Sequence, residues 1–133
     1  MKLTTKSEYS LLALICIARQ QKDGFMKIDD ICKKYNMPKK YLEQLFHILE
    51  SNRYLRAKRG ANGGYALTKT PNKITLAEII RLMDGALAPT ESVSRYFFSH
   101  TPIEKEKKIL RVLKEIRDYI AERLENLTLA DLI

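Results

Sequence analysis

Four polar side chains within one segment of eight residues have the chemistry needed to hydrogen-bond to the edges of nucleic-acid bases. A helix that begins at Pro38 turns by about 100° per residue and gathers one polar set on a single face: Lys40, Glu43, Gln44 and His47. The apolar residues collect on the other side: Leu42, Leu45, Phe46 and Leu49. Such a polar face fits a major groove. An ordinary solvated face is the alternative, and the neighbouring elements decide between the two.

A glycine-rich loop follows this helix and carries one arginine. Residues 54–58 and 65–68 alternate apolar and polar positions, as strands do, so the loop joins a hairpin. Its glycines permit positive φ angles and close backbone approach to a partner: Gly60, Gly63 and Gly64. Arg59 stands where the loop begins and is placed to enter a minor groove. A plain hairpin with a surface arginine is the alternative.

A second short helix precedes the polar-faced one. Residues 28–35 place Ile28, Ile31, Cys32 and Tyr35 on one inward face, and only Asn36 and Met37 separate this segment from Pro38. Two helices joined by so tight a turn form a helix-turn-helix, in which the second helix reads the groove. With the hairpin as a wing, the sequence predicts a mainly α fold with a small β-hairpin: a winged helix-turn-helix followed by a long C-terminal helix.

The positive charge of the chain is concentrated in its first part. Residues 1–74 hold 15 Lys and Arg against 6 Asp and Glu, a net charge of +9, whereas residues 75–133 hold 9 against 10. A chain polarised in this way has a side that faces a polyanion. A membrane surface is a weaker partner, because no basic amphipathic helix with an exposed aromatic face is found in the sequence. Double-stranded DNA is therefore the expected partner, and no membrane.

Several motifs resemble those of a known family of regulators. The matching segments are Leu3–Tyr9, Tyr41–Leu45, Arg59–Tyr65, Ile79–Gly85 and Leu127–Leu132. Together they resemble the Rrf family of winged-helix bacterial regulators, which includes IscR, NsrR and CymR. The resemblance implies a dimeric transcription factor with Tyr41, Glu43 and Gln44 in the major groove and Arg59 in the minor groove. The expected DNA-binding residues are Lys6, Tyr9, Lys39, Lys40, Tyr41, Glu43, Gln44, His47, Arg59, Gly60, Asn62, Gly63 and Gly64.

One departure from this family concerns cysteine. Cluster-binding members carry three closely spaced cysteines before the long helix, but residues 86–100 contain none. The two thiols of the chain, Cys16 and Cys32, lie within apolar helical patterns and are expected to be small buried hydrophobes. Two thiols cannot supply four cluster ligands. The chain thus resembles the cluster-free CymR-like branch, and no metal or cofactor is expected.

Three segments match the capping box that marks the start of a helix, in which a hydroxyl residue is followed by glutamate three positions later. The pairs are Thr5 with Glu8, Thr75 with Glu78, and Thr101 with Glu104. From Thr101 an unbroken helix of about 24 residues, about 36 Å long, is expected to reach about Asn126.

An apolar stripe along this last helix predicts dimerisation. Its members step by three or four residues: Ile109, Leu113, Ile116, Ile120 and Leu124. A helix that projects from a small domain finds part of its partner surface on a second chain; packing on the first helix is the alternative, and both can occur together. The expected organisation is a DNA-binding domain at 1–85, a connecting segment at 86–100, and a dimerisation helix with a C-terminal turn at 101–133.

Three adjacent aromatic residues, Tyr96, Phe97 and Phe98, end the connecting segment. They cannot all face one core side of a helix or strand, so at least one is expected to be exposed or to enter an inter-subunit pocket. Our hypothesis is that this segment replaces the cluster loop as a surface for a small-molecule effector or a regulatory protein. The alternative is that the three rings plug the junction between the domain and the long helix.

Other classes of function find less support in the sequence. Neither His47 nor His100 has an evident nucleophile or metal partner, and the loop from Gly60 to Gly64 lacks P-loop spacing, so no enzyme is expected. Two cysteines and the absence of a signal peptide indicate a cytoplasmic protein.

The expected function is therefore sequence-specific transcriptional regulation, chiefly repression, by a homodimer on a palindromic operator and without an iron–sulfur cluster. Two alternatives stay open. One is an interaction module that docks a metabolic enzyme, and the other is a thiol- or metal-based redox sensor that uses Cys16 or Cys32.

Overall fold

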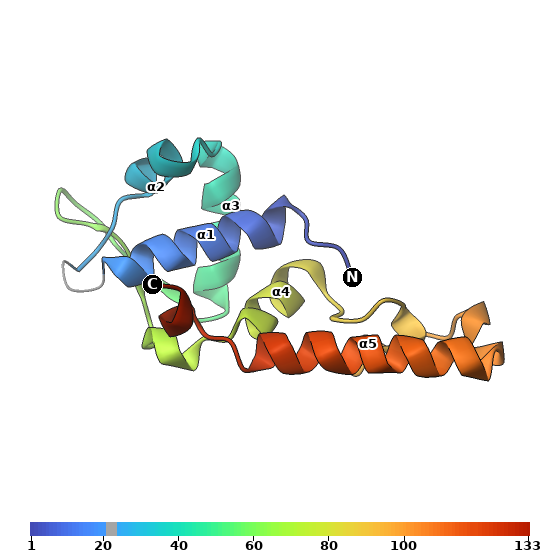
Figure 1. The fold of residues 1–133 in the computed structure, drawn as a ribbon. Coiled ribbons are helices and arrows are strands. Elements are labelled where there is room, and N and C mark those ends of the chain that lie inside the picture. Colours follow the sequence, from blue (N-terminus) through green and yellow to red (C-terminus); the bar gives the residue numbers. More distant parts are fainter. Residues whose placement is uncertain (21–23) are drawn as a thin grey trace.

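Four helices and a hairpin form a head, from which the last long helix extends as an arm (Figure 1). The computed structural model describes residues 1–20 and 24–133. Its helices and strands are α1 Thr5–Arg19, α2 Ile28–Tyr35, α3 Lys39–Ser51, β1 Leu55–Lys58, β2 Gly64–Leu67, α4 Leu76–Asp84 and α5 Lys107–Glu125. Short 3₁₀ turns cover Pro71–Lys73, Glu91–Val93, Pro102–Lys105 and Leu129–Leu132. The predicted fold class, mainly helical with one small hairpin, is confirmed.

The core of the head lies between α1, α3 and α4, and the last residues of the chain close it. Leu14, Phe46 and Ile79 are fully buried, one from each of these helices, and Leu129 from the C-terminal turn is fully buried with them. The backbone N–H of Leu129 donates to the carbonyl of Ile74 at 3.0 Å. The C-terminal end of α5 is therefore tied to the head by the turn that follows it.

The helix-turn-helix forms as the sequence predicts. Helix α2 has the expected bounds, and it ends at Asn36 in the left-handed conformation with φ of 53°. The next residue, Met37, is buried, and Pro38 stands just ahead of the first residue of α3. Asparagine tolerates the left-handed region better than most side chains, so this one residue can turn the chain from one helix into the next.

The wing is a two-stranded antiparallel hairpin extended by a third segment. Leu55 pairs with Leu67, and Lys58 pairs with Gly64. On the other side of β2, Met26 and Tyr65 exchange two backbone hydrogen bonds of 2.8 and 2.7 Å. Because β2 is hydrogen-bonded on both sides, the base of the wing is fixed to the chain that enters α2.

Two of the three predicted helix starts need correction. At Thr75 and Glu78 the capping box is present, as predicted. The cap of α1 is Thr4, one residue earlier than predicted, and its hydroxyl accepts a hydrogen bond from the N–H of Lys6. The box at Thr101 is also formed, but it starts only a 3₁₀ turn.

The predicted unbroken helix from Thr101 is therefore wrong. Glu106 has an extended backbone, with φ of −107° and ψ of 93°, and α5 begins after it at Lys107. The helix has 19 residues, which makes it about 28 Å long at 1.5 Å per residue. None of the helices in the described part of the chain combines the length and apolar character that a membrane crossing requires.

Candidate nucleic-acid interface

Helix α3 has one buried face and one open polar face. Leu42, Leu45, Phe46 and Leu49 are buried, as predicted. The opposite face carries exposed side chains that together line a shallow surface hollow: Lys40, Glu43, Gln44 and His47. The hollow holds donors and acceptors in a row along one helix, which is the arrangement that hydrogen-bonds to base edges.

Tyr41 connects α3 to α1. Its hydroxyl lies 3.0 Å from the hydroxyl of Thr5, and its ring meets the ring of Tyr9 edge to face, with centroids 5.7 Å apart. Tyr9 and Tyr41 are half-buried, whereas Lys6 is exposed on the first turn of α1. The structure thus brings Tyr9 to the first turn of α3, and the N-terminal turn of α1 borders the candidate interface.

Among the residues that the structure describes, Lys39 is the one basic residue of this interface that forms an ion pair. Its Nζ lies 2.9 Å from a carboxylate oxygen of Asp29 on α2, and both side chains are largely exposed. The hydrogen bond to Asp29 raises the pKa of Lys39. An exposed pair of this kind is weak, so a DNA phosphate can compete with Asp29 for the ammonium group.

The loop of the wing presents its polar residues to solvent. Arg59, Gly60 and Asn62 are exposed at the tip, and the N–H of Gly63 donates to the carbonyl of Gly60 at 3.0 Å. Gly60 has a φ of 102°, which explains the need for glycine there. Among the described residues, Arg59 has no ion-pair partner, so its guanidinium is available to a ligand.

Gly63 and Gly64 have a structural role within the chain. The sequence interpretation explained these glycines by the close approach of a binding partner. A Cβ on Gly63 would overlap the carbonyl of Lys58, and a Cβ on Gly64 would overlap the carbonyl of Met26. The close approach that requires glycine is thus an approach of the chain to itself. It holds the hairpin loop and the segment at Met26 together.

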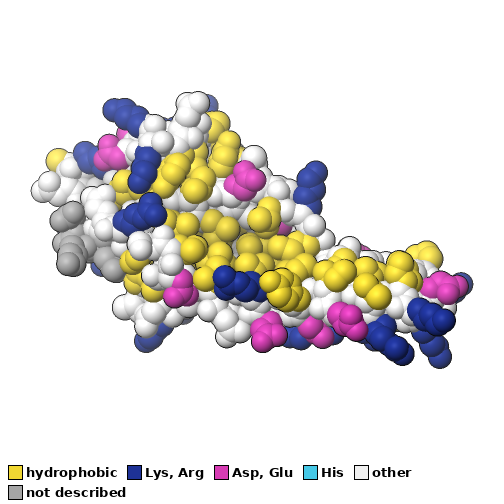
Figure 2. Space-filling view, in the orientation of Figure 1, with side chains coloured by type: hydrophobic (Ala, Val, Ile, Leu, Met, Phe, Trp, Pro, Cys, Tyr) yellow, Lys and Arg dark blue, Asp and Glu magenta, His cyan; other side chains and the backbone are white. Residues whose placement is uncertain are grey.

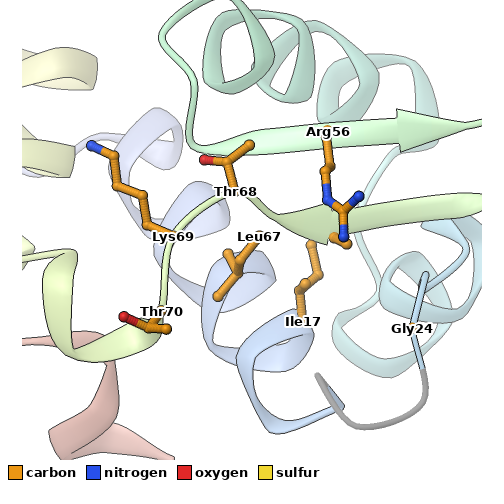
Figure 3. Close-up of a pocket in the computed structure, with 8 residues that line it drawn as sticks. Ile17, Gly24, Arg56, Leu67, Thr68, Lys69 and Thr70 are labelled. Atoms are coloured by element: carbon orange, nitrogen blue, oxygen red, sulfur yellow. The ribbon is translucent and has the colours of Figure 1, made fainter.

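The wing carries a second basic surface that the sequence analysis did not predict. The ring of Phe25 lies under two cations of β1, 5.0 Å from the guanidinium carbon of Arg56 and 5.6 Å from Nζ of Lys58. Arg56 also borders a hollow of about 260 Å³ together with Thr68 and Lys69 (Figure 3). The alternation of β1 does place Arg56 and Lys58 on one side, but nothing in the sequence shows that Phe25 lies against them.

The apolar stripe of α5 is divided between two surroundings. Ile120 and Leu124 pack against the core of the head, and Leu113 is half-buried. The other two members of the stripe, Ile109 and Ile116, are exposed, and so are the large side chains beside them, Val112 and Tyr119. Figure 2 shows hydrophobic side chains continuing from the head along the arm. One half of the stripe therefore packs within the chain, where α4 rather than α1 is the main helix that α5 contacts. The other half is open, and its pairing with a second chain stays a prediction.

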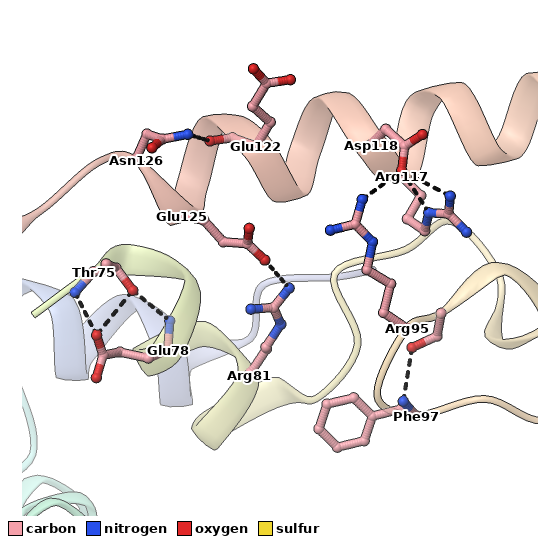
Figure 4. A network of polar contacts seen from close by, with 11 residues as sticks. Thr75, Glu78, Arg81, Arg95, Phe97, Arg117, Asp118, Glu122, Glu125 and Asn126 are labelled. Atoms are coloured by element: carbon pink, nitrogen blue, oxygen red, sulfur yellow. Dashed lines mark hydrogen bonds and ion pairs between the residues drawn. The ribbon is translucent and has the colours of Figure 1, made fainter.

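The segment before α5 is tied to the arm, but its aromatic rings stay outside. Arg117 donates to the carbonyl of Val93 at 3.0 Å, and Arg95 pairs with Asp118 at 2.9 Å (Figure 4). Val93 is buried, whereas the rings are exposed by 69 % for Tyr96, 45 % for Phe97 and 52 % for Phe98. Val93 therefore fills this junction, and the three rings do not plug it.

The fold and this interface together define a class of protein, the winged helix-turn-helix DNA-binding transcriptional regulators. The chain belongs to the Rrf2 family: the family model, described as an iron-dependent transcriptional regulator, matches residues 3–133. The resemblance stated from the motifs is confirmed.

Individual relatives agree with this assignment. The regulator CymR of Bacillus subtilis is 34 % identical over 132 residues, which cover 99 % of this chain and 89 % of CymR. The regulator IscR of Pectobacterium carotovorum is 29 % identical over 140 residues, covering 100 % of this chain and 79 % of IscR. The solved structure of CymR, the global cysteine regulator of B. subtilis, superposes with a TM-score of 0.81 at 32 % identity, covering 99 % and 95 % of the two chains. T. potens IscR superposes with a TM-score of 0.72 at 28 % identity, covering 99 % and 85 %.

The residues of this chain do not fit an iron–sulfur cluster, although the family description mentions iron. Cys16 is buried in α1 beside the sulfur of Met26, 3.7 Å away, and Cys32 is half-buried on α2. Burial raises the pKa of both thiols, which disfavours the thiolate that ligates iron or reacts with oxidants. Within residues 1–20 and 24–133, no three His, Cys, Asp or Glu side chains gather in a way that could hold a metal ion. We therefore assign no step to such a group.

Proposed function

We propose that this protein is a homodimeric repressor that binds a two-fold symmetric operator. The observation that carries the proposal is the open polar face of α3 beside a wing whose Arg59 has no ion-pair partner among the described residues. A transcriptional regulator with one reading helix per chain covers one half-site, and two chains related by a two-fold axis cover an inverted repeat.

The proposed contacts divide by chemistry. Gln44 hydrogen-bonds to a base edge in the major groove, and Glu43 and His47 complete the readout along α3. Arg59 enters the minor groove with Gly60 and Asn62 at the tip of the wing. Tyr41 joins Glu43 and Gln44 in the major groove. The phosphate contacts come from the basic and hydroxyl groups that border the reading face: Lys6, Tyr9, Lys39 and Lys40. Phosphate contacts fix register, and base contacts provide specificity.

The dimer is proposed to form through the open half of the α5 stripe. Ile109 and Ile116 lie on that half, with Val112 and Tyr119 beside them. A two-fold axis across α5 covers both copies of this stripe at once, because the same patch meets itself. Leu113 lies at the edge of the contact, while Ile120 and Leu124 support the arm on its own head.

Binding-site selection from a random duplex pool tests the proposal. The expected result is an inverted repeat with half-sites about one helical turn apart. A selected pool without any symmetric motif would contradict the proposed operator. We further propose that the protein acts in the cytoplasm, without a cofactor and without catalytic activity. The segment Tyr96–Phe98 is the proposed surface for its regulatory signal.

A further inference from the structure

A groove of about 630 Å³ lies where the head meets the segment before α5. Its wall contains residues from three parts of the chain: Tyr54 after α3, Glu78, Arg81 and Leu82 on α4, and Tyr96 and Phe97 in the connecting segment. The two aromatic rings of the connecting segment are open to solvent on this side. The groove therefore has an apolar lip next to charged groups of α4.

The acidic group in this groove is already occupied. One carboxylate oxygen of Glu78 accepts the hydroxyl of Tyr54 at 2.6 Å. The other accepts the backbone N–H of Thr75 at 2.8 Å and its hydroxyl at 3.0 Å (Figure 4). With three donors in place, Glu78 has little capacity left for a cationic ligand.

The cation in the groove is, by contrast, only partly engaged. Nη2 of Arg81 lies 2.7 Å from Oε1 of Glu125, and the guanidinium carbon lies 4.7 Å from the ring centre of Tyr96. A guanidinium has five N–H donors, and within the described residues Glu125 is the one hydrogen-bond partner of the Arg81 guanidinium. Donors of Arg81 thus remain for an anion that enters beside Tyr96.

We propose that this groove binds a small organic acid. The anionic group, a carboxylate or sulfonate, pairs with Arg81 in a charge-assisted contact, and the apolar body of the acid lies against Tyr96, Phe97 and Leu82. This site gives a ligand class to the regulatory role proposed above for Tyr96–Phe98. Binding of the acid does not depend on the proposed function, but its effect on DNA binding does.

The same contact gives the ligand a route to the dimer arm. A bound anion competes with Glu125 for Arg81, and the Arg81–Glu125 pair joins α4 to α5. Ile116 and Glu125 are nine positions apart, about two and a half turns, so the open dimer stripe lies on the other side of α5. The acid therefore changes the joint between head and arm without covering the stripe, and it shifts the dimer only if it binds two arrangements with different affinity.

A fluorescence titration of the full chain with 1-anilinonaphthalene-8-sulfonate, without DNA, tests this site. Arg81→Gln should weaken probe binding about tenfold or more, because it removes a charge-assisted contact. Glu125→Gln should tighten binding several-fold, because it removes the competitor. Glu115→Gln is the matched control: it removes an exposed acid of α5 that lies outside the groove, and it should leave binding unchanged. Displacement by 2-naphthoate but not by neutral 2-naphthamide is expected.

Three results would overturn the proposal. One is equal binding by wild type, Arg81→Gln and Glu125→Gln. The second is loss of the probe site in Tyr119→Ala alone, which would place the probe on the α5 stripe. The third is equal displacement by the neutral amide. If Arg81→Gln loses its helical circular-dichroism signal, the test rests on Glu125→Gln. Tighter probe binding by Glu125→Gln supports the proposal, and unchanged or weaker binding contradicts it. The probe titration contains no DNA, so a negative titration does not contradict the repressor proposal. Likewise, a failed operator selection does not contradict a positive titration.

Discussion

Thr4 and Asp84 join the two ends of the head across 80 positions of the chain. The carboxylate of Asp84 accepts the backbone N–H of Thr4 at 2.9 Å and also its hydroxyl. Asp84 ends α4, and Thr4 caps α1, so this contact holds the N-terminal turn of α1 against α4. The same end of α1 carries Thr5 and Tyr9, which contact Tyr41 near the start of α3.

Asp84→Asn should therefore destabilise the head by about 1 kcal/mol, since it weakens two hydrogen bonds to an ionised acceptor. Desolvation opposes ionisation of Asp84, but hydrogen bonds from the first turn of α1 outweigh it, and the pKa is lowered. A lowered folded pKa gives stability that is present above the unfolded pKa, about 3.9, and is lost as the pH falls through the folded value.

Urea unfolding of wild type and Asp84→Asn between about pH 7 and pH 3 checks this linkage. The difference in unfolding free energy should be largest near neutrality and shrink in the acidic range. A difference that stays constant down to the lowest pH would show that the charge of Asp84 does not stabilise the fold.

Gln44→Ala should relax base preference at one position of each half-site, at a cost of about 1–3 kcal/mol per half-site. The loss should be confined to the preferred base, because an alanine cannot distinguish the four base pairs through hydrogen bonds. Anisotropy titrations against the selected operator and its single-base variants measure the effect. An unchanged ranking of those variants would remove Gln44 from the readout.

Arg59→Ala provides the contrast within the same experiment. It should weaken binding mainly at operators whose wing-contacted steps are A·T-rich, where a narrow minor groove attracts arginine. The affinity for operators with G·C pairs at those steps should change less. Equal loss on both operator types would mean that Arg59 acts only as a phosphate contact outside the groove.

Ile116→Glu should convert the proposed dimer to monomers, because it places a charge in the open half of the α5 stripe. Arg111→Gln is the control: Arg111 is an exposed α5 residue, and its replacement changes the net charge by the same amount. Sedimentation velocity at micromolar concentration reports the oligomeric state. If both variants remain dimeric, the two-fold contact lies elsewhere, and if both dissociate, charge rather than the stripe holds the dimer.

Protein purified without oxygen should be colourless, with no charge-transfer absorption above 320 nm and no stoichiometric iron. The reason is the donor set: residues 86–100 contain no cysteine, and Cys16 is buried in α1. Iron and sulfide analysis with a visible spectrum checks this. A brown protein with both elements bound would assign ligand roles to His100 or to acidic side chains.

Local patterns were enough to predict the two helices of the helix-turn-helix. The apolar spacing of α3 and the tight turn at Asn36 lie within one stretch of chain, so periodicity and turn chemistry determine them. The start of α1 shows where prediction from local sequence fails. Thr4 and Thr5 are equally good caps in sequence, and it is Asp84, 80 positions away, that accepts the hydroxyl of Thr4 and favours it.

The break at Glu106 had no local signal either. No glycine or proline interrupts the run from Lys105 to Lys107, and the capping box at Thr101 is satisfied just as well by a 3₁₀ turn. The groove at Arg81 and the stacking of Phe25 depend on segments that are far apart in the chain, and periodicity carries no information about such contacts.

The salt dependence of operator affinity, measured beside a scrambled duplex of equal length, tests the central claim most directly. If each protomer neutralises three to five phosphates, affinity should fall about 10³–10⁵-fold between 50 and 200 mM salt. The operator should also remain preferred over the scrambled duplex at every salt concentration, by about 10³-fold or more. A flat salt response, or equal affinity for the two duplexes, would contradict the account of a sequence-reading winged-helix dimer.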